Sequence, residues 1–190
     1  MKKKNILVVV GLVLITLGVV LYSTQKRNGD IEYIDESLVL TKEEATKLVE
    51  DTINNVINVY ENKDKVFEID ESYESEKEVK VTNYDEVVKT IFSENGIKEL
   101  ESISFEKNKY VTKNDNGIFL LKEIPSDNQY TGSSITLENF NIGENEITCT
   151  ATLSTYKLVN DKLTYYVFEK NVKLVKNEEN WLVDTFKYSN

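Results

Sequence analysis

Apolar residues recur at three- and four-residue intervals through residues 41–61, a pattern that predicts a long amphipathic helix. Thr41 and Glu44 stand at the spacing of a capping box, in which two side chains satisfy main-chain N–H groups at the start of a helix. The apolar stripe needs a packing partner, because burying each large side chain contributes roughly 1.5 to 3 kcal/mol. Its members are Ala45, Leu48, Val49, Ile53, Val56, Ile57 and Tyr60.

Two shorter helices are predicted next. Residues 82–96 show a second apolar stripe, with Asn83 and Glu86 as its capping pair and Gly96 as the residue that ends the helix. Residues 97–105 continue at helical spacing and predict a short third helix.

From about Lys109 the period changes to strict alternation, which predicts β-strands separated by turns rich in Asn, Asp and Gly. Helices followed by an antiparallel meander are the order of an α+β domain. We therefore predict an α+β fold in which N-terminal helices pack on a curved antiparallel meander sheet, as in cystatin-like or NTF2-like domains. The strands are expected at residues 117–124, 134–142, 146–159, 163–175 and 181–188, and the buried or rim-facing sheet residues are Tyr165, Val167, Trp181, Val183 and Phe186.

The N-terminus carries an apolar run, residues 6–22, behind three lysines. With residues 23–25 added, this run is long enough to span a bilayer. Only Ser23 offers a small residue for cleavage, which favours an uncleaved anchor over a cleaved signal peptide, and the lysines favour a body outside the cytoplasm.

The chain is accordingly divided in two. We expect a signal anchor or signal peptide at residues 1–29 and an extracytoplasmic α+β domain at residues 30–190. Contact with the membrane would run through residues 6–25, and the protein would be anchored in the cell membrane or secreted to the cell wall.

Charge separates the same two parts. The full chain has 23 basic and 33 acidic residues. Residues 1–30 hold five of the basic residues and one of the acidic ones, so 18 and 32 remain, a formal net charge of −14. Such a surface repels nucleic acid and accelerates encounter with basic partners, although acidity also serves solubility alone. We expect no nucleic-acid partner.

Few residues are suited to catalysis or metal binding. Histidine is absent, which excludes Ser/His and Cys/His catalysis and the commonest zinc ligand. Cys149 stands alone on the apolar side of a predicted strand, so it forms no disulfide within the chain and is expected to be buried and inert. Residues 70–78 are acidic but lack the spacing and central glycine of an EF-hand loop. We expect no enzymatic activity, no cofactor and no metal.

Four segments carry a resemblance to a known family. They are "LTKEEATKLVEDTINNVINVYENKD", "NYDEVVKTIFSENGIKELES", "IPSDNQYTGSS" and "VKNEENWLVDTFKY". In order and spacing the chain resembles the IseA family of bacterial DL-endopeptidase inhibitors over most of residues 38–190. The resemblance implies a proteinaceous inhibitor, expected to be a monomer, that blocks the Cys/His groove of NlpC/P60-type peptidoglycan hydrolases. A basic hydrolase of the cell wall is the partner that the acidic body would favour.

A turn-rich loop is the candidate contact element. It lies within residues 122–137, holds the only proline of the chain, and occupies the place of a Gly-rich loop in the family that the chain resembles. Polar loops between strands often carry binding residues, although an ordinary solvent-exposed loop is the alternative. The candidate partner-binding residues are Pro125 to stiffen the entry, Ser126, Asp127 and Asn128 to form side-chain turns, Tyr130 as an anchor, and Gly132 for a reversal.

A second candidate turn contains Asp115 and Asn116 and could lie beside this loop, although Asn-Gly sequences also close hairpins for local reasons. Two other functions remain open. One is a membrane-anchored NTF2-like module that assembles an envelope complex through its sheet edges or helix face. The other is a ligand pocket between the helix and the sheet, for which bound ligand would raise thermal stability.

Overall fold

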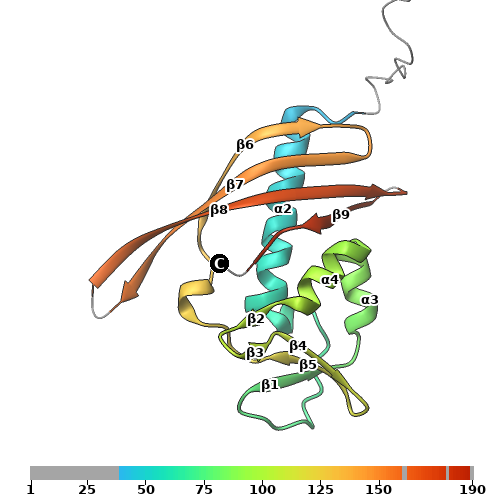
Figure 1. Ribbon diagram of the computed structural model, residues 1–190, viewed down its shortest axis with the longest axis vertical. Helices are drawn as coiled ribbons and strands as arrows, with labels where there is room; N and C mark the ends of the chain where they lie inside the picture. The colour runs from blue at the N-terminus through green and yellow to red at the C-terminus, as the bar shows by residue number, and fades with distance from the viewer. Residues whose placement is uncertain (1–38, 160–161, 179, 189–190) are drawn as a thin grey trace, which may run out of the picture. The chain divides into compact units, whose positions relative to one another are not determined.

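Helices and antiparallel sheets make up the described part of the chain, residues 39–159, 162–178 and 180–188 of this computed structural model (Figure 1). The α-helices within these ranges are α2 (Lys42–Glu61), α3 (Tyr84–Ile91) and α4 (Glu94–Ser102). The predicted α+β class is therefore confirmed. The expected membrane segment, residues 6–25, lies outside the described residues, and none of the helices within them is long and apolar enough to cross a bilayer.

Helix α2 begins with the predicted capping box. The hydroxyl oxygen of Thr41 accepts a hydrogen bond from the N–H of Glu44 at 3.3 Å, and the Glu44 carboxylate accepts from the N–H of Thr41 at 2.9 Å. The apolar stripe of the helix is buried almost completely, with Ala45, Val49, Ile53, Val56, Ile57 and Tyr60 at most 5% exposed. Side chains therefore fill the interface between this helix and the structure that packs on it.

The larger sheet is the predicted antiparallel meander, with strand order β6-β7-β8-β9. Its strands are β6 (Ser134–Ile142), β7 (Glu146–Val159), β8 (Lys162–Asn177) and β9 (Asn180–Thr185), and α2 lies against one face (Figure 1). Alternate residues of β7, namely Ile147, Cys149, Ala151 and Leu153, face the core. The predicted burial of Cys149 is confirmed, and burial raises the pKa of its thiol to about 11.

A smaller sheet completes the body, with strand order β1-β5-β4. Its strands are β1 (Glu78–Val81), β4 (Val111–Asn114) and β5 (Gly117–Leu121), and a separate short pair is formed by β2 (Ser104–Phe105) and β3 (Asn108–Lys109). Single turns of 3-10 helix lie at η2 (Lys63–Lys65) and η3 (Ser126–Asn128).

The predicted ends of the second helix are wrong. The Asn83 side chain makes no cap and instead accepts a hydrogen bond from the N–H of Glu68 at 2.9 Å. Gly96 does not end α3, which stops at Ile91, but lies inside α4. Ser93 caps the start of α4, because its hydroxyl oxygen accepts a hydrogen bond from the N–H of Gly96 at 3.1 Å. A Cβ at Gly96 would lie 2.2 Å from the carbonyl oxygen of Val183, so close packing against β9 explains this glycine.

A buried lysine follows the C-terminal end of α2. Lys63 is 7% exposed, and its ammonium donates to the carbonyl oxygens of Tyr60 at 2.6 Å and Lys122 at 3.1 Å. Burial lowers its pKa to about 8. Lys170 on β8 is equally buried, and burial, followed by repulsion from Lys187, also lowers its pKa to about 8.

These two lysines predict a stability that rises in alkaline solution. An unfolded lysine has a pKa of about 10.4, so between pH 8 and 10 the unfolded state binds more protons and the free energy of unfolding increases with pH. We expect each lysine to contribute on the order of 2 kcal/mol to this rise. Urea denaturation at about pH 7.5 and about pH 9.5 measures it. The Cys149 thiol, whose pKa burial raises, offsets part of the rise in wild type and variant alike. The rise in the variant Lys63→Met should be smaller than that of the wild type by about 2 kcal/mol, and an equal rise in both proteins would contradict this assignment.

Candidate binding surface

The candidate loop connects β5 to β6 and spans residues 122–133. Pro125 precedes η3 with φ −56° and ψ 141°, and the N–H of Asn128 donates to its carbonyl oxygen at 2.9 Å. Main-chain bonds thus close this turn. The side-chain turn expected at Asn128 is not formed through its side-chain oxygen, which is buried and accepts no hydrogen bond from the described residues. Ser126, Asp127 and Gln129 are exposed at its tip.

One carboxylate holds the far end of this loop. Glu61, the last residue of α2, accepts hydrogen bonds from the N–H groups of Tyr130 and Thr131, the second at 2.9 Å, and from the hydroxyl of Tyr188. Asn62 adds a bond to the hydroxyl oxygen of Thr131 at 3.4 Å. Because these bonds come from a helix end, the loop backbone is fixed relative to the core.

Tyr130 fixes the loop from inside, and its expected role as an exposed anchor is wrong. Its side chain is 0% exposed, its ring meets those of Phe168 and Tyr188 edge to face, and its hydroxyl donates to the carbonyl oxygen of Tyr188 at 2.9 Å. Burial, and then the carboxylates of Glu61 and Asp127, raise its pKa. The residue is therefore a core residue that positions the loop.

The glycine of the loop has the conformation that was predicted. Gly132 has φ +78°, which residues with a side chain rarely adopt, and it lies in open space where the chain reverses towards β6. The predicted sharp reversal at Gly132 is confirmed.

Asp115 and Asn116 lie elsewhere. They form the turn between β4 and β5, where the side-chain oxygen of Asn114 accepts a hydrogen bond from the N–H of Asn116 at 2.8 Å. Strand β5 runs from this turn to the start of the loop, so the two lie at opposite ends of one strand (Figure 1). The expectation that this turn lies beside the loop is therefore wrong.

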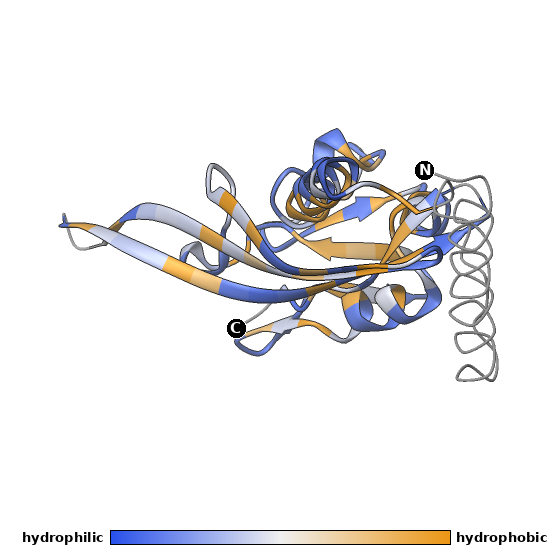
Figure 2. Cartoon of the chain, turned by 90° about the horizontal axis from the view of Figure 1, so that it is seen from above, coloured by the Kyte–Doolittle hydropathy of each residue, from blue (hydrophilic) through white to orange (hydrophobic). Residues whose placement is uncertain are grey.

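The loop instead lies beside a projecting part of the larger sheet. Strands β7 and β8 continue beyond their neighbours as a two-stranded arm, residues 155–159 and 162–167, which extends well past the helices in Figure 2. The ammonium of Lys157 donates to the carbonyl oxygen of Ser126 at 2.5 Å and lies 5.4 Å from the ring centre of Tyr166. This contact joins the loop to one face of the arm.

A groove of about 560 Å³ separates the loop from the arm. Asp127 and Gln129 line it from the loop, and Lys157 and Tyr166 line it from the arm. Sequence reasoning missed both Glu61 and Lys157 as residues that shape this region. The sequence did carry a signal for Lys157, because a charged residue stands there at the inward-facing strand parity of Cys149 and Leu153. Nothing in the sequence marked Glu61.

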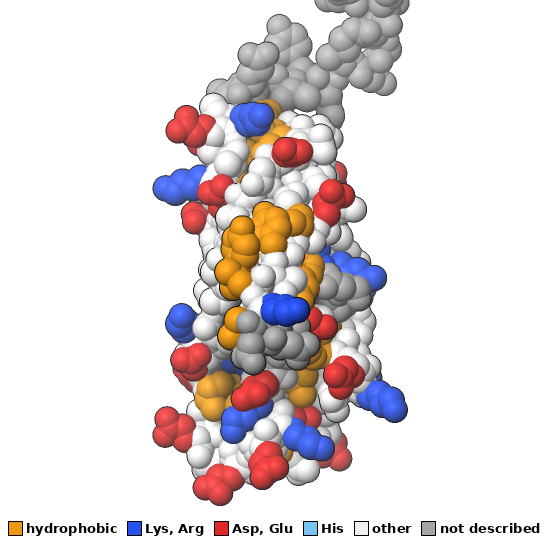
Figure 3. Space-filling view, turned by 90° about the vertical axis from the view of Figure 1, so that its left-hand side faces the viewer, with side chains coloured by type: hydrophobic (Ala, Val, Ile, Leu, Met, Phe, Trp, Pro, Cys, Tyr) orange, Lys and Arg blue, Asp and Glu red, His pale blue; other side chains and the backbone are white. Residues whose placement is uncertain are grey.

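The outward face of the arm is apolar. Five large side chains there are between 54% and 70% exposed, and Figure 3, which faces the end of the arm, shows apolar side chains gathered on it. The expectation that Tyr165 and Val167 are buried or line the rim is wrong, whereas Val183 and Phe186 are buried as predicted. The five residues are Tyr156, Leu158, Leu163, Tyr165 and Val167.

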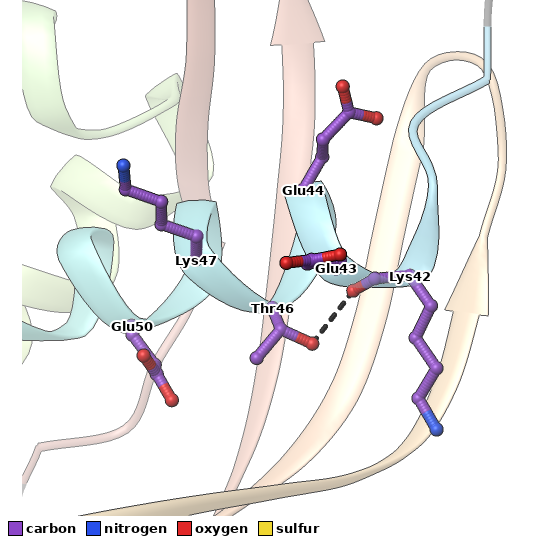
Figure 4. A pocket seen from close by; sticks show the side chains of 6 residues that line it. All are labelled: Lys42, Glu43, Glu44, Thr46, Lys47 and Glu50. Atoms are coloured by element: carbon purple, nitrogen blue, oxygen red, sulfur yellow. Dashed lines mark hydrogen bonds between the residues drawn. The ribbon is translucent and has the colours of Figure 1, made fainter.

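Another hollow, of about 740 Å³, lies over the first turns of α2 and offers no converging groups. Its six lining side chains point in different directions, and Thr46 donates back to the carbonyl oxygen of Lys42 at 2.8 Å (Figure 4). Within the described ranges, no group of three or more Cys, Asp or Glu side chains is placed to hold a metal ion.

No family model, curated protein or solved structure matches this chain.

Proposed function

We propose that this protein is a proteinaceous inhibitor that binds cell-wall DL-endopeptidases of the NlpC/P60 type and blocks their active-site groove. The observation that carries the proposal is the fixed shape of the loop at residues 122–133. Glu61 holds its main chain from the end of α2, and buried Tyr130 holds it from the core. A segment already ordered before binding loses little conformational entropy in a complex.

The exposed tip is suited to enter a groove. Ser126, Asp127 and Gln129 project between two fixed ends, and Pro125 restricts the entry. Because a 3-10 turn closed by main-chain bonds is not an extended strand, this tip does not present the extended backbone that proteases usually bind. The tip is therefore better suited to block an active site than to be cleaved as a substrate.

The remainder of the proposal follows from resemblance and charge. The wrap of the four-stranded meander over α2 supports a cystatin-like or NTF2-like fold of the kind implied for IseA relatives. The acidic body, with −14 formal charges, supports a basic hydrolase as partner, mainly through faster association at low salt. An apolar N-terminal segment supports an extracytoplasmic location, in the membrane or in the wall.

A second candidate function is a membrane-anchored NTF2-like assembly module of an envelope complex. The apolar outward face of the arm favours it, because large exposed apolar patches mark interaction surfaces. In that case the arm, and not the loop, would carry the function.

Two matched variants test the loop. Asp127→Lys reverses one exposed charge at its tip, whereas Asp115→Lys makes the same change at the opposite end of β5. We expect Asp127→Lys to weaken inhibition of a purified DL-endopeptidase roughly 10- to 100-fold, as a central interface charge does, with no change in melting temperature. Asp115→Lys should inhibit like the wild type. Equal effects of the two variants on inhibition would show that the tip of this loop does not contact the hydrolase.

A further inference from the structure

The arm is a part of the sheet that its neighbouring strands leave uncovered. Strand β6 pairs with β7 only as far as Ser154, and β9 pairs with β8 only from Lys173. Among the described strands, β7 and β8 therefore pair only with each other along the arm. An isolated two-stranded ribbon is marginally stable in water, so an arm of this kind is usually supported on its faces.

Only one face of the arm has such support. The inward face meets the loop through Lys157 and Ser126, and Phe168 packs against Tyr130. On the outward face, Tyr156 lies opposite Tyr165, with ring centres 4.9 Å apart, and Leu158 lies opposite Leu163. These pairs form a continuous apolar strip that nothing in the described part of the chain covers.

The same face of the sheet is polar away from the arm. On β7 and β8 the outward positions before the arm are Thr148, Thr150, Thr152, Glu169, Asn171 and Lys173. Further back, Val175 is an apolar outward residue on β8, and it is partly buried. The exposed large apolar side chains of this face are therefore confined to the projecting part, which a sheet that simply faces solvent does not require.

We propose that the outward face of the arm binds a second copy of this chain, face to face, and so forms a symmetric dimer. In a two-fold contact the same patch is used on both copies, and an apolar strip is complementary to itself. The middle pair, Tyr156 and Tyr165, would lie near the symmetry axis, flanked by Leu158 and Leu163 of each copy. This inference does not rest on the proposed hydrolase target.

Charge favours a second copy over a basic partner or an anionic surface. Residues 155–167 contain two lysines, Lys157 and Lys162, and one carboxylate, Asp161, whereas the body beyond residue 30 carries −14 formal charges. A basic enzyme would be attracted to the body and not to this face. An anionic bilayer would repel the body. Two copies joined at their projecting arms keep their acidic bodies apart.

The area is close to what a dimer needs. At 54% to 70% exposure, the five outward side chains offer roughly 600 Å² of apolar surface. A standard protein interface uses about 800 Å² per partner, and the strand edges and the Lys162 stem can supply the rest. We therefore expect a dissociation constant of about 1 to 100 µM. The loop packs on the opposite face of the arm, so its tip stays accessible in the dimer.

Sedimentation velocity on the chain from residue 30 onward measures self-association. Every core residue of the described ranges lies within this piece, so the described fold is kept whole in it. We expect the wild type to dimerise as its concentration rises from about 1 µM to about 1 mM. The double variant Leu158→Ser, Leu163→Ser should raise the dissociation constant of the dimer by about 50-fold or more. Its melting temperature at low concentration should be unchanged. The control Thr150→Ser, Thr152→Ser alters the polar part of the same face and should dimerise like the wild type.

Cross-linking provides an independent readout. Tyr165→Cys places a thiol near the predicted axis, and mild oxidation should join two copies, whereas Asn171→Cys, also exposed on this face of β8, should stay monomeric. Cys149 is buried in both variants. Wild-type protein that remains monomeric throughout the concentration range overturns the proposal. Monomers that bind phosphatidylglycerol vesicles through Leu158 and Leu163 also overturn it and assign the arm to a lipid surface.

Discussion

Tyr130→Ala is expected to lower the free energy of unfolding by about 3 to 5 kcal/mol, as large-to-small changes at buried aromatic sites do. The side chain is fully buried between Phe168 and Tyr188, and its loss leaves a cavity where the loop meets the core. Tyr130→Phe keeps the ring and removes the hydroxyl that donates to the carbonyl oxygen of Tyr188, so about 1 kcal/mol is expected. Urea denaturation of the three proteins measures both losses.

The matched control for this change is Tyr165→Ala. Tyr165 is the same residue type at 54% exposure on the arm, and its replacement should cost less than about 1 kcal/mol in dilute solution. Similar losses at both positions would show that Tyr130 is not the core residue described above. Loss of inhibition in Tyr130→Ala would show that the loop has been displaced. Direct contact between the loop and the hydrolase is tested by Asp127→Lys at the exposed tip.

Gly96→Ala is expected to destabilise the protein by at least about 3 kcal/mol although it adds a single methyl group. The new Cβ would lie 2.2 Å from the carbonyl oxygen of Val183 and 3.2 Å from the Cβ of Phe92. The nearer group is main chain, so α4 and β9 must move apart, and the hydrogen bond from the N–H of Ser93 to the Val183 oxygen, at 2.9 Å, would be disturbed. Thermal and urea denaturation measure the loss.

Gly132→Ala is the control for Gly96→Ala, because it introduces backbone strain without a steric clash. Gly132 has φ +78° but no atom within 4 Å of a Cβ, so alanine there should cost only about 1 kcal/mol. If Gly96→Ala costs no more than Gly132→Ala, then α4 and β9 do not pack as closely as the structure indicates.

The local pattern of the sequence was sufficient for much of the fold. Alternation located β6 and β7 at residues 134–142 and 146–159, and the Thr41 capping box located the start of α2. These features depend on neighbours in sequence. Cys149 was placed correctly for the same reason, because strand parity decides which face a residue occupies.

The features that sequence reasoning missed depend on where other elements end. Tyr165 and Val167 have the outward parity of Glu169 and Asn171 on β8, and no described element covers that face at the arm. Gly96 was interpreted as a helix end, because the approach of Val183, 87 residues later in the chain, leaves no local signal. Tyr130 suits both an exposed anchor and a core site, and only the positions of Glu61 and Tyr188 distinguish them.

The most direct measurement is the hydrolysis of peptidoglycan by a purified NlpC/P60-type DL-endopeptidase, with and without the chain from residue 30 onward. The proposed function predicts a dose-dependent loss of hydrolysis that is stronger at low salt, is absent after heat denaturation of the added protein, and is weakened by Asp127→Lys but not by Asp115→Lys. Unchanged hydrolysis across several such enzymes, at both low and high salt, would contradict it.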